Sequence, residues 1–225
     1  MQLDDLSFRD RAEAGRQLAR HLLGYRSQRP VVLALPRGGV PVAYEVARAL
    51  QAPLDLLFVR KIGAPGHAEF GLGAVVDGAH PQVVLNDEVL AQLDVTPEYI
   101  RAETERQLRE IERRRQHYLA GRRPVEIERR TAIVVDDGVA TGGTVRAALK
   151  GVARVRPARL VLAVPVAPAE TIERLRAEAD EVVCLMMPEP FYAVGEHYDN
   201  FTQTSDREVI DLLDKAQRWN RESVL

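Results

Sequence analysis

The sequence has one cysteine, few aromatic residues and no long apolar run, and each shortage excludes a class of protein. Cys184 has no second cysteine with which to pair, so an internal disulfide cannot stabilise this 225-residue chain. Its apolar neighbours predict a small core residue. The apolar runs are too short to cross a bilayer, so we expect no transmembrane helix.

Lysine is also scarce, because Lys61, Lys150 and Lys215 are the only three and arginine carries nearly all of the positive charge. The formal net charge is −2, and Arg-rich and Glu-rich stretches are interleaved. This balance disfavours general electrostatic binding of DNA or RNA. Acidic residues occupy the positions in residues 1–15 where a signal peptide needs an apolar core. We therefore expect a cytoplasmic protein that binds neither nucleic acid nor membrane.

Apolar strands alternate with helical segments from residue 31 to residue 185. This alternation predicts an α/β fold with a doubly wound parallel sheet, because strands covered by helices on both faces are apolar throughout. The length suits a single domain over 1–225. The strands are expected at 31–35, 54–59, 131–135, 160–166 and 181–185, and the helices at 8–24, 41–50, 96–120, from 144, and at 168–179.

Two helix starts are predicted from capping residues. Thr96 followed by Pro97 is typical of an N-cap and a first-turn proline. Ser7 is the expected N-cap of the helix over 8–24, with Phe8 on its buried face. The helix at 96–120 is dense in Arg and Glu, which is typical of a solvent-exposed face.

Residues 131–149, TAIVVDDGVATGGTVRAAL, carry the clearest chemical pattern. A buried strand ends at Asp136 and Asp137, a glycine-spaced loop follows, and a helix begins near Thr144. The free N–H groups at a helix start favour a phosphate-sized anion. The two carboxylates accept hydrogen bonds, for which sugar hydroxyls are natural donors. A ribose 5-phosphate satisfies both halves of this site.

A second strand–loop–helix unit contains the loop 36–39, Pro-Arg-Gly-Gly. Its glycines suit an anion-binding turn, and Arg37 adds a fixed positive charge. A tight turn with a solvated arginine is the alternative interpretation. Because ligands in such sheets bind at the carboxyl ends of the strands, both glycine-rich loops are expected at one edge.

The segment 62–73 is rich in glycine and proline and follows two cations, Arg60 and Lys61. A loop of this length predicts a flap that closes over an anionic ligand. Residues 74–76 and 82–85 are expected to pair next to it as a β-hairpin.

Four aromatic residues gather in the tail of this aromatic-poor chain. One interpretation is a small core for a C-terminal subdomain, and the other is a hood whose ring stacks on a flat substrate. Both interpretations stay open. The four residues are Phe191, Tyr192, Tyr198 and Phe201.

Taken together, these motifs resemble the type I phosphoribosyltransferases, which bind phosphoribosyl pyrophosphate (PRPP). VVDDGVATGGT resembles the signature of that family, LPRGGV its pyrophosphate loop and VRKIGAPGH its flexible loop. YAVGEHYD resembles the hood of purine-salvage members. The likeness covers most of residues 31–199, and the long helix at 96–120 departs from compact members.

The resemblance implies a core at about 30–186, a hood at about 187–225 that the N-terminal segment can join, and a helical insertion at about 96–120. Its catalytic residues would be Asp136, Asp137, Arg37 and Lys61. PRPP-binding would involve Arg37, Gly38, Gly39, Arg60, Lys61, Asp136, Asp137, Gly138, Val139, Ala140, Thr141, Gly142, Gly143 and Thr144. Base-binding would involve Tyr192, Phe191 and Val194.

The same resemblance implies a transferase that moves the 5-phosphoribosyl group to a nucleobase, with a 6-oxopurine favoured, and releases pyrophosphate. Mg²⁺ would be held mainly by PRPP, with Asp199 as a further ligand, and a homodimer is expected because relatives are commonly dimers. The peptide bond between Pro36 and Arg37 is expected to be cis. A PRPP-binding regulatory protein without turnover is the alternative.

Overall fold

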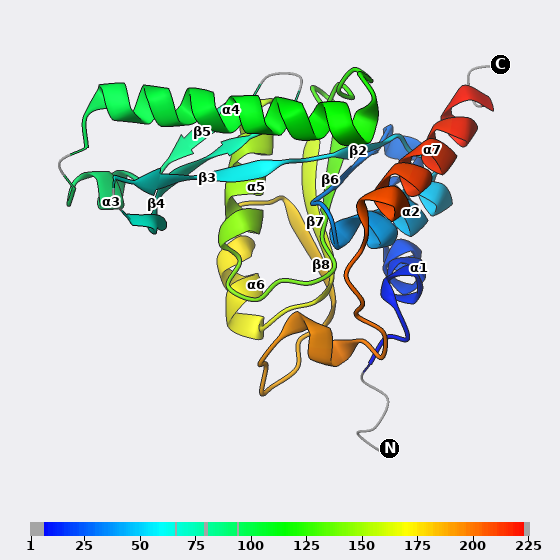
Figure 1. Cartoon of the computed structure of the whole chain (residues 1–225). Helices are drawn as coiled ribbons and strands as arrows, with labels where there is room; N and C mark the ends of the chain where they lie inside the picture. The colour runs from blue at the N-terminus through cyan, green and yellow to red at the C-terminus, as the bar shows by residue number, and fades with distance from the viewer. Residues whose placement is uncertain (1–6, 66, 79–80, 94, 223–225) are drawn as a thin grey trace.

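The computed structural model describes residues 7–65, 67–78, 81–93 and 95–222, and at its centre lies a five-stranded parallel sheet (Figure 1). The predicted parallel α/β sheet is therefore confirmed. The strand order is β2-β1-β6-β7-β8, so the chain winds outward from the centre in both directions. The strands are β1 (Val31–Ala34), β2 (Leu54–Leu56), β6 (Thr131–Val135), β7 (Arg159–Val166) and β8 (Glu181–Met186).

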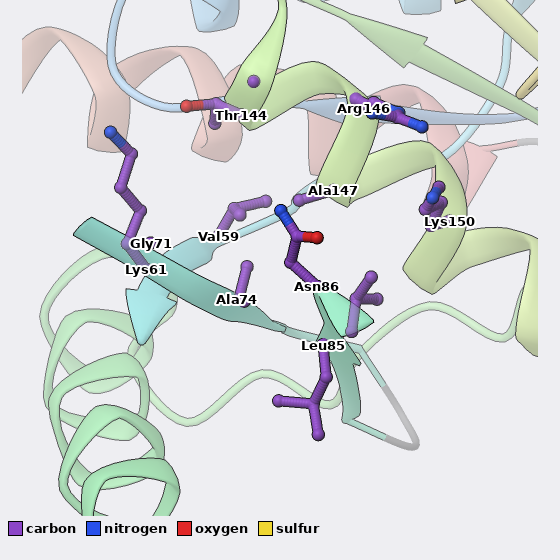
Figure 2. Close-up of a pocket in the computed structure, with 13 residues that line it drawn as sticks. Val59, Lys61, Gly71, Ala74, Leu85, Asn86, Thr144, Arg146, Ala147 and Lys150 are labelled. Atoms are coloured by element: carbon purple, nitrogen blue, oxygen red, sulfur yellow. The ribbon is translucent and has the colours of Figure 1, made fainter. Parts of the chain in front are cut away.

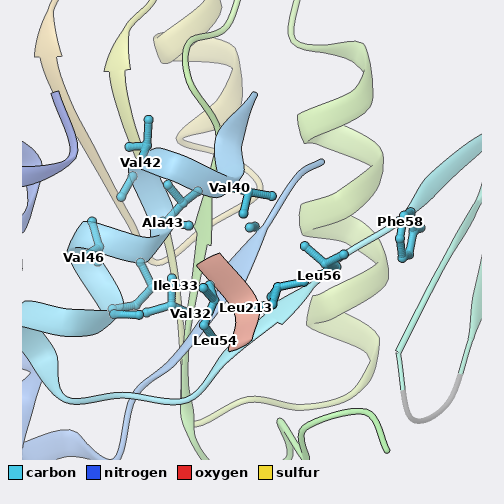
Figure 3. Close-up of a cluster of buried hydrophobic side chains, with 14 of the residues drawn as sticks. Val32, Val40, Val42, Ala43, Val46, Leu54, Leu56, Phe58, Ile133 and Leu213 are labelled. Atoms are coloured by element: carbon cyan, nitrogen blue, oxygen red, sulfur yellow. The ribbon is translucent and has the colours of Figure 1, made fainter. Parts of the chain in front are cut away.

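Helices cover both faces of this sheet. Side chains alternate between the faces along each strand, so Val32 and Ile133 belong to one buried cluster and Val31 and Ala132 to the other. Figure 3 shows the first cluster, in which Val32 and Ile133 lie beside the helices that cover that face. Those helices are α1 (Arg11–Leu22), α2 (Gly39–Leu50) and α7 (Asp206–Glu222), while α5 (Gly143–Arg154) and α6 (Ala169–Leu175) cover the other face.

A second, antiparallel sheet contains β3 (Val59–Ala64), β4 (His67–Val76) and β5 (Gln82–Leu85). The predicted pairing of 74–76 with 82–85 is confirmed. The loop prediction for 62–73 is wrong, because the described residues of this segment pair as a β3–β4 hairpin. Glycine here marks the irregular register of paired strands rather than a free loop. The single strand predicted at 54–59 is also wrong, because β2 and β3 belong to different sheets.

Helix α4 (Pro97–Leu119) begins as predicted, with the Thr96 hydroxyl accepting a 3.3 Å hydrogen bond from the Tyr99 N–H. It follows the short helix α3 (Asp87–Leu90) and runs across the second sheet toward α7 (Figure 1). None of the helices in the described ranges is long and apolar enough to span a membrane.

Arg115 attaches α4 to the body of the protein through two buried ion pairs. Its guanidinium lies 2.5 Å from the Asp77 carboxylate and 3.4 Å from that of Asp55. Asp55 also accepts a 2.8 Å hydrogen bond from the Val125 N–H, so it contacts both the helix and the segment that follows it. Burial raises the pKa of Asp55 and of Asp77, and the Arg115 charge opposes that rise.

The N-terminal segment departs from its prediction. Asp10, not Ser7, is the N-cap of α1, because its carboxylate accepts a 2.7 Å hydrogen bond from the Glu13 N–H. Phe8 lies outside the helix and forms a β-bridge with Tyr198 of the tail. The remaining elements are the 3₁₀ turns η1 (Leu23–Gln28) and η2 (Val194–His197). We use "hood" for residues 7–10 together with 187–205.

We predict that Arg115→Met destabilises the fold by about 3–5 kcal/mol, because two carboxylates then stay buried without a partner. The measurement is urea denaturation, with Arg109→Met as control, since that side chain is 71% exposed and its pair with Glu105 is 3.9 Å long. In the variant the native carboxyl pKa values rise further above their unfolded values. The native state then binds protons more readily, so the variant should regain stability as the pH falls toward about 4. Equal effects of the two substitutions would contradict the role of Arg115.

Candidate functional site

Two glycine-containing loops meet at the carboxyl edge of the central sheet. β1 pairs directly with β6, and the Leu35 N–H donates a 2.9 Å hydrogen bond to the Val135 carbonyl where the strands end. A β-carbon at position 39 would lie 2.8 Å from the Val135 carbonyl oxygen and 2.9 Å from the Asp136 α-carbon, so this approach of the two backbones requires glycine. The Pro36–Arg37 peptide bond is cis, as predicted.

The loop at 138–142 leads into the N-terminus of α5. Gly142 has φ of +80°, a left-handed conformation that glycine adopts readily, and it is the N-cap residue of the helix. Thr171 of α6 supports the loop by donating a 2.8 Å hydrogen bond to the Ala140 carbonyl. Thr141 and Thr144 are exposed. This geometry presents free N–H groups and two hydroxyls at a helix start, which is an anion-binding arrangement.

A cavity of about 520 Å³ lies between this helix start and the second sheet. Its lining includes Lys61 of β3 and Gly143 and Thr144 of α5. In Figure 2 the Lys61 side chain extends toward Thr144. The β3–β4 hairpin therefore places Lys61 beside the anion-binding loop. Arg60 contacts α4 instead, because its Nε donates a 3.0 Å hydrogen bond to Gln107.

The two adjacent acids occupy different surroundings. Burial, and then the charge of Asp137, raise the pKa of Asp136 well above its ordinary value. An Asp136 carboxylate oxygen accepts a 2.9 Å hydrogen bond from the Asp137 N–H. Asp137 instead directs its carboxylate toward Arg11 of α1.

Arg11 is a site residue that sequence reasoning missed. Its Nε lies 2.7 Å from the Asp137 carboxylate, and a second nitrogen donates a 2.8 Å hydrogen bond to the Thr202 carbonyl. The guanidinium carbon lies 3.9 Å from the centre of the Phe201 ring, a cation–π distance. Arg11 is buried, so it neutralises Asp137 in a partly desolvated setting. Nothing in the local sequence distinguishes it from the other arginines.

Arg37 is turned away from the paired acids. Its guanidinium lies 3.0 Å from the carboxylate of Asp206, the first residue of α7. The Tyr118 hydroxyl donates a 2.6 Å hydrogen bond to the same Asp206 oxygen. Gly38 and Gly39 still lie against the Asp136–Asp137 segment, so the backbone of the loop is in place while its side chain is engaged elsewhere.

The hood packs against the loop that follows Asp137. The Tyr198 hydroxyl donates a 2.5 Å hydrogen bond to the Asp137 carbonyl, and Val194 lies against Gly138. The Phe191 ring stacks on His197 with 5.3 Å between ring centres, whereas the Tyr192 side chain projects outward with 76% of its surface exposed. Val194 thus lies near the anion-binding loop, and Tyr192 makes no ring contact within the described part of the chain.

The carboxylates of Asp136, Asp137 and Asp199 are suitable ligands for Mg²⁺, but they do not form a complete metal site within the described residues. Asp199 lies in the hood, where it accepts a 2.6 Å hydrogen bond from the Ser7 hydroxyl. Across residues 7–65, 67–78, 81–93 and 95–222 no group of three or more His, Cys, Asp or Glu side chains could hold a metal ion. Mg²⁺ typically binds one or two carboxylates together with substrate phosphates, and these residues fit that mode.

Comparisons with known proteins agree on one family. The sequence model described as "Phosphoribosyl transferase domain" matches residues 82–200, which is 119 of the 225 residues. A candidate phosphoribosyl transferase of Mycobacterium tuberculosis, recorded in two strains, is 49% identical over 213 residues. That alignment covers 94% of this chain and 47% of the relative, so the chain spans about half the length of the curated relatives it matches.

A solved structure supports the same fold. The crystal structure of the protein TT1426 from Thermus thermophilus is 45% identical in sequence to this chain and superimposes with a TM-score of 0.81. The likeness covers 93% of this chain and 98% of that one.

Arg11→Met should raise the pKa of Asp136 further, because the variant removes a positive charge that lowers it. It should also destabilise the fold by about 3 kcal/mol, since Asp137 loses its buried partner. Carbon-13 NMR titration of the carboxyl groups and urea denaturation measure the two effects. Arg9→Met is the control, because the Arg9 side chain is 69% exposed. An unchanged Asp136 pKa in Arg11→Met would show that the guanidinium does not act on the acid pair.

Proposed function

Because the chain belongs to the phosphoribosyl transferase family, we propose that it transfers the 5-phosphoribosyl group of PRPP to an acceptor and releases pyrophosphate. One observation carries this proposal. The phosphate-binding loop, the paired acids and the Arg37 loop meet at one sheet edge, with Lys61 facing the phosphate loop. This arrangement offers donors to both charged ends of PRPP and acceptors to its ribose.

The start of α5 would hold the 5-phosphate of PRPP. The backbone from Gly138 to Thr144, which includes Ala140 and Gly143, would supply N–H donors. Val139 belongs to this loop, but its N–H already donates a 2.9 Å hydrogen bond to the Val166 carbonyl. The Thr141 and Thr144 hydroxyls are exposed and would add two more. The helix dipole favours the phosphate charge at this position.

Asp136 and Asp137 would accept hydrogen bonds from the ribose hydroxyls. Bond breaking between C1 and the pyrophosphate oxygen leaves positive charge on the ribose ring, and nearby carboxylates stabilise that charge. Asp137 is paired with Arg11, whereas the Asp136 carboxyl forms no ion pair within the described residues. We therefore assign the closer ribose contact to Asp136.

Arg37, Gly38, Gly39 and Lys61 would bind the leaving pyrophosphate. An arginine grips two phosphate oxygens at once and a lysine supplies a mobile point charge. Arg37 must exchange Asp206 for pyrophosphate to do so. Arg60, which contacts α4, would support the hairpin that carries Lys61. Mg²⁺, bound mainly through PRPP oxygens with Asp199 as a further candidate ligand, would neutralise part of the pyrophosphate charge.

The acceptor is proposed to be a nucleobase, and a 6-oxopurine is favoured. A new bond forms between C1 and a ring nitrogen, the C1–pyrophosphate bond breaks, and the nitrogen loses its proton to solvent. Phe191, Tyr192 and Val194 in the hood would contact the base, and the exposed Tyr192 ring is free to stack on a flat ligand. This assignment rests on the resemblance of the hood to purine-salvage enzymes.

The decisive measurement is pyrophosphate release from PRPP and Mg²⁺ across a panel of nucleobases. We expect release with at least one 6-oxopurine. Tight PRPP binding without release for any base would favour the regulatory alternative.

Lys61→Ala should lower kcat/KM for PRPP by about 100-fold to 1,000-fold, because it removes a cation that faces the developing pyrophosphate charge. The matched control is Lys215→Ala, which removes an exposed lysine from α7. Steady-state kinetics with the best base from the panel measure both variants. Equal activity of Lys61→Ala and Lys215→Ala would remove Lys61 from the proposed site.

A further inference from the structure

A second cavity, of about 450 Å³, lies beside the Arg37 loop. It is bounded by the loop, by one face of α4 and by the start of α7, and we call it the α4 pocket. None of the sequence motifs predicted it. Its polar lining consists of Arg37, Arg113, Arg114, His117, Tyr118 and Asp206.

The α4 pocket is rich in positive charge because of helical spacing. Arg113, Arg114 and His117 lie within four residues of one another, which places them on one side of α4. Arg115 faces the buried acids instead. Glu110, one turn earlier, accepts hydrogen bonds of 2.9 Å from Arg113 and 2.8 Å from Arg114, so it offsets part of this charge.

Asp206 shows that the donors of the pocket converge on an anion. Its carboxylate accepts hydrogen bonds from Arg37 and Tyr118, and His117 Nε2 lies 3.4 Å away. The two donors come from separate places in the chain, the Arg37 loop and the last turn of α4, where His117 also lies. The Asp206 side chain is 48% exposed, so a ligand can reach the donors that it engages. Charged donors that bind a carboxylate in this way also bind phosphate oxygens.

We propose that the α4 pocket binds the diphosphate group of PRPP and of the released pyrophosphate. This assignment rests on the proposed function and adds α4 to it. Arg37 is the shared residue, because it belongs to the predicted pyrophosphate loop and lines the pocket. A diphosphate held by Arg37 at one end meets Arg113, Arg114 and His117 at the other. Arginine suits this task because its planar fork binds two phosphate oxygens. The long helix that separates this chain from compact relatives thereby gains a role at the site.

The test uses inorganic pyrophosphate and the full chain in isothermal titration calorimetry. The double variant Arg113→Gln/Arg114→Gln should bind pyrophosphate at least tenfold more weakly than the unmodified protein. Arg109→Gln is the matched control on the same helix, since the Arg109 side chain is 71% exposed and does not line the pocket. It should change the affinity less than twofold. Circular dichroism and thermal melting establish that each variant is folded.

Asp206→Asn is expected to change the pyrophosphate affinity in the opposite direction. It removes the negative charge that competes with the ligand, so pyrophosphate should bind several-fold more tightly. A residue with a merely structural role would leave the affinity unchanged or weaken it. Saturating PRPP should also abolish pyrophosphate binding, because the two share the pocket.

The outcomes separate this proposal from the proposed function. Pyrophosphate affinity that is equal in the double variant and in Arg109→Gln would overturn the α4 pocket, even if the enzyme turns over PRPP. Simultaneous binding of PRPP and pyrophosphate would overturn it as well. Pyrophosphate binding that depends on Arg113 and Arg114 in a protein without turnover would retain the pocket and refute the transferase activity.

Discussion

The site depends on the direct pairing of β1 with β6, two strands separated by about a hundred residues of sequence. Parallel neighbours end at the same edge, so the loop after β1 and the loop after β6 must face each other. The hydrogen bond from the Leu35 N–H to the Val135 carbonyl continues this pairing up to the loops themselves. Glycine at position 39 then permits the close approach of the two backbones, because a β-carbon there would meet the Val135 carbonyl oxygen and the Asp136 α-carbon.

Two charged groups at this edge, Asp137 and Arg37, are already paired within the protein. Arg11 pairs with Asp137, and Arg37 pairs with Asp206. Charges that are partly buried cost free energy unless they are paired, so these contacts let the fold hold them beside the sheet. The proposed ligand, with its phosphate and hydroxyl groups, would replace one set of partners by another rather than create a charged interior. Binding at this site would therefore exchange ion pairs within the protein for contacts with the ligand.

The features that were predicted correctly from sequence depend on local signals. The Thr96 cap, the alternation of strands and helices, and the 74–85 hairpin each involve neighbours along the chain. The DDGVATGG loop was also recognisable, because its residues are contiguous. Arg11 could not be predicted in the same way, since its partner Asp137 is 126 positions away and one arginine among many carries no local mark.

The wrong loop prediction has a related cause. Glycine and proline in residues 62–73 indicated a free segment, but hydrogen bonds to the partner strand outweigh the weak intrinsic preferences of these residues. Ser7 was wrong as a helix cap for a similar reason. The Ser7 hydroxyl donates a hydrogen bond to Asp199 in the tail, and Asp10 is the N-cap of α1 instead. Tertiary contacts decided both cases.

The buried contacts of Arg115 also bear on how this chain evolved. Asp55 and Asp77 precede α4 in the sequence, and both lie in the body to which the helix is attached. A lineage that lost α4 would leave Asp55 and Asp77 without the Arg115 charge that pairs with both of them. The helix and the two aspartates therefore depend on each other, because a change at any one of the three positions leaves a buried charge without its partner. Among homologues these three positions should change together, so their joint presence can mark the members of the family that carry this helix.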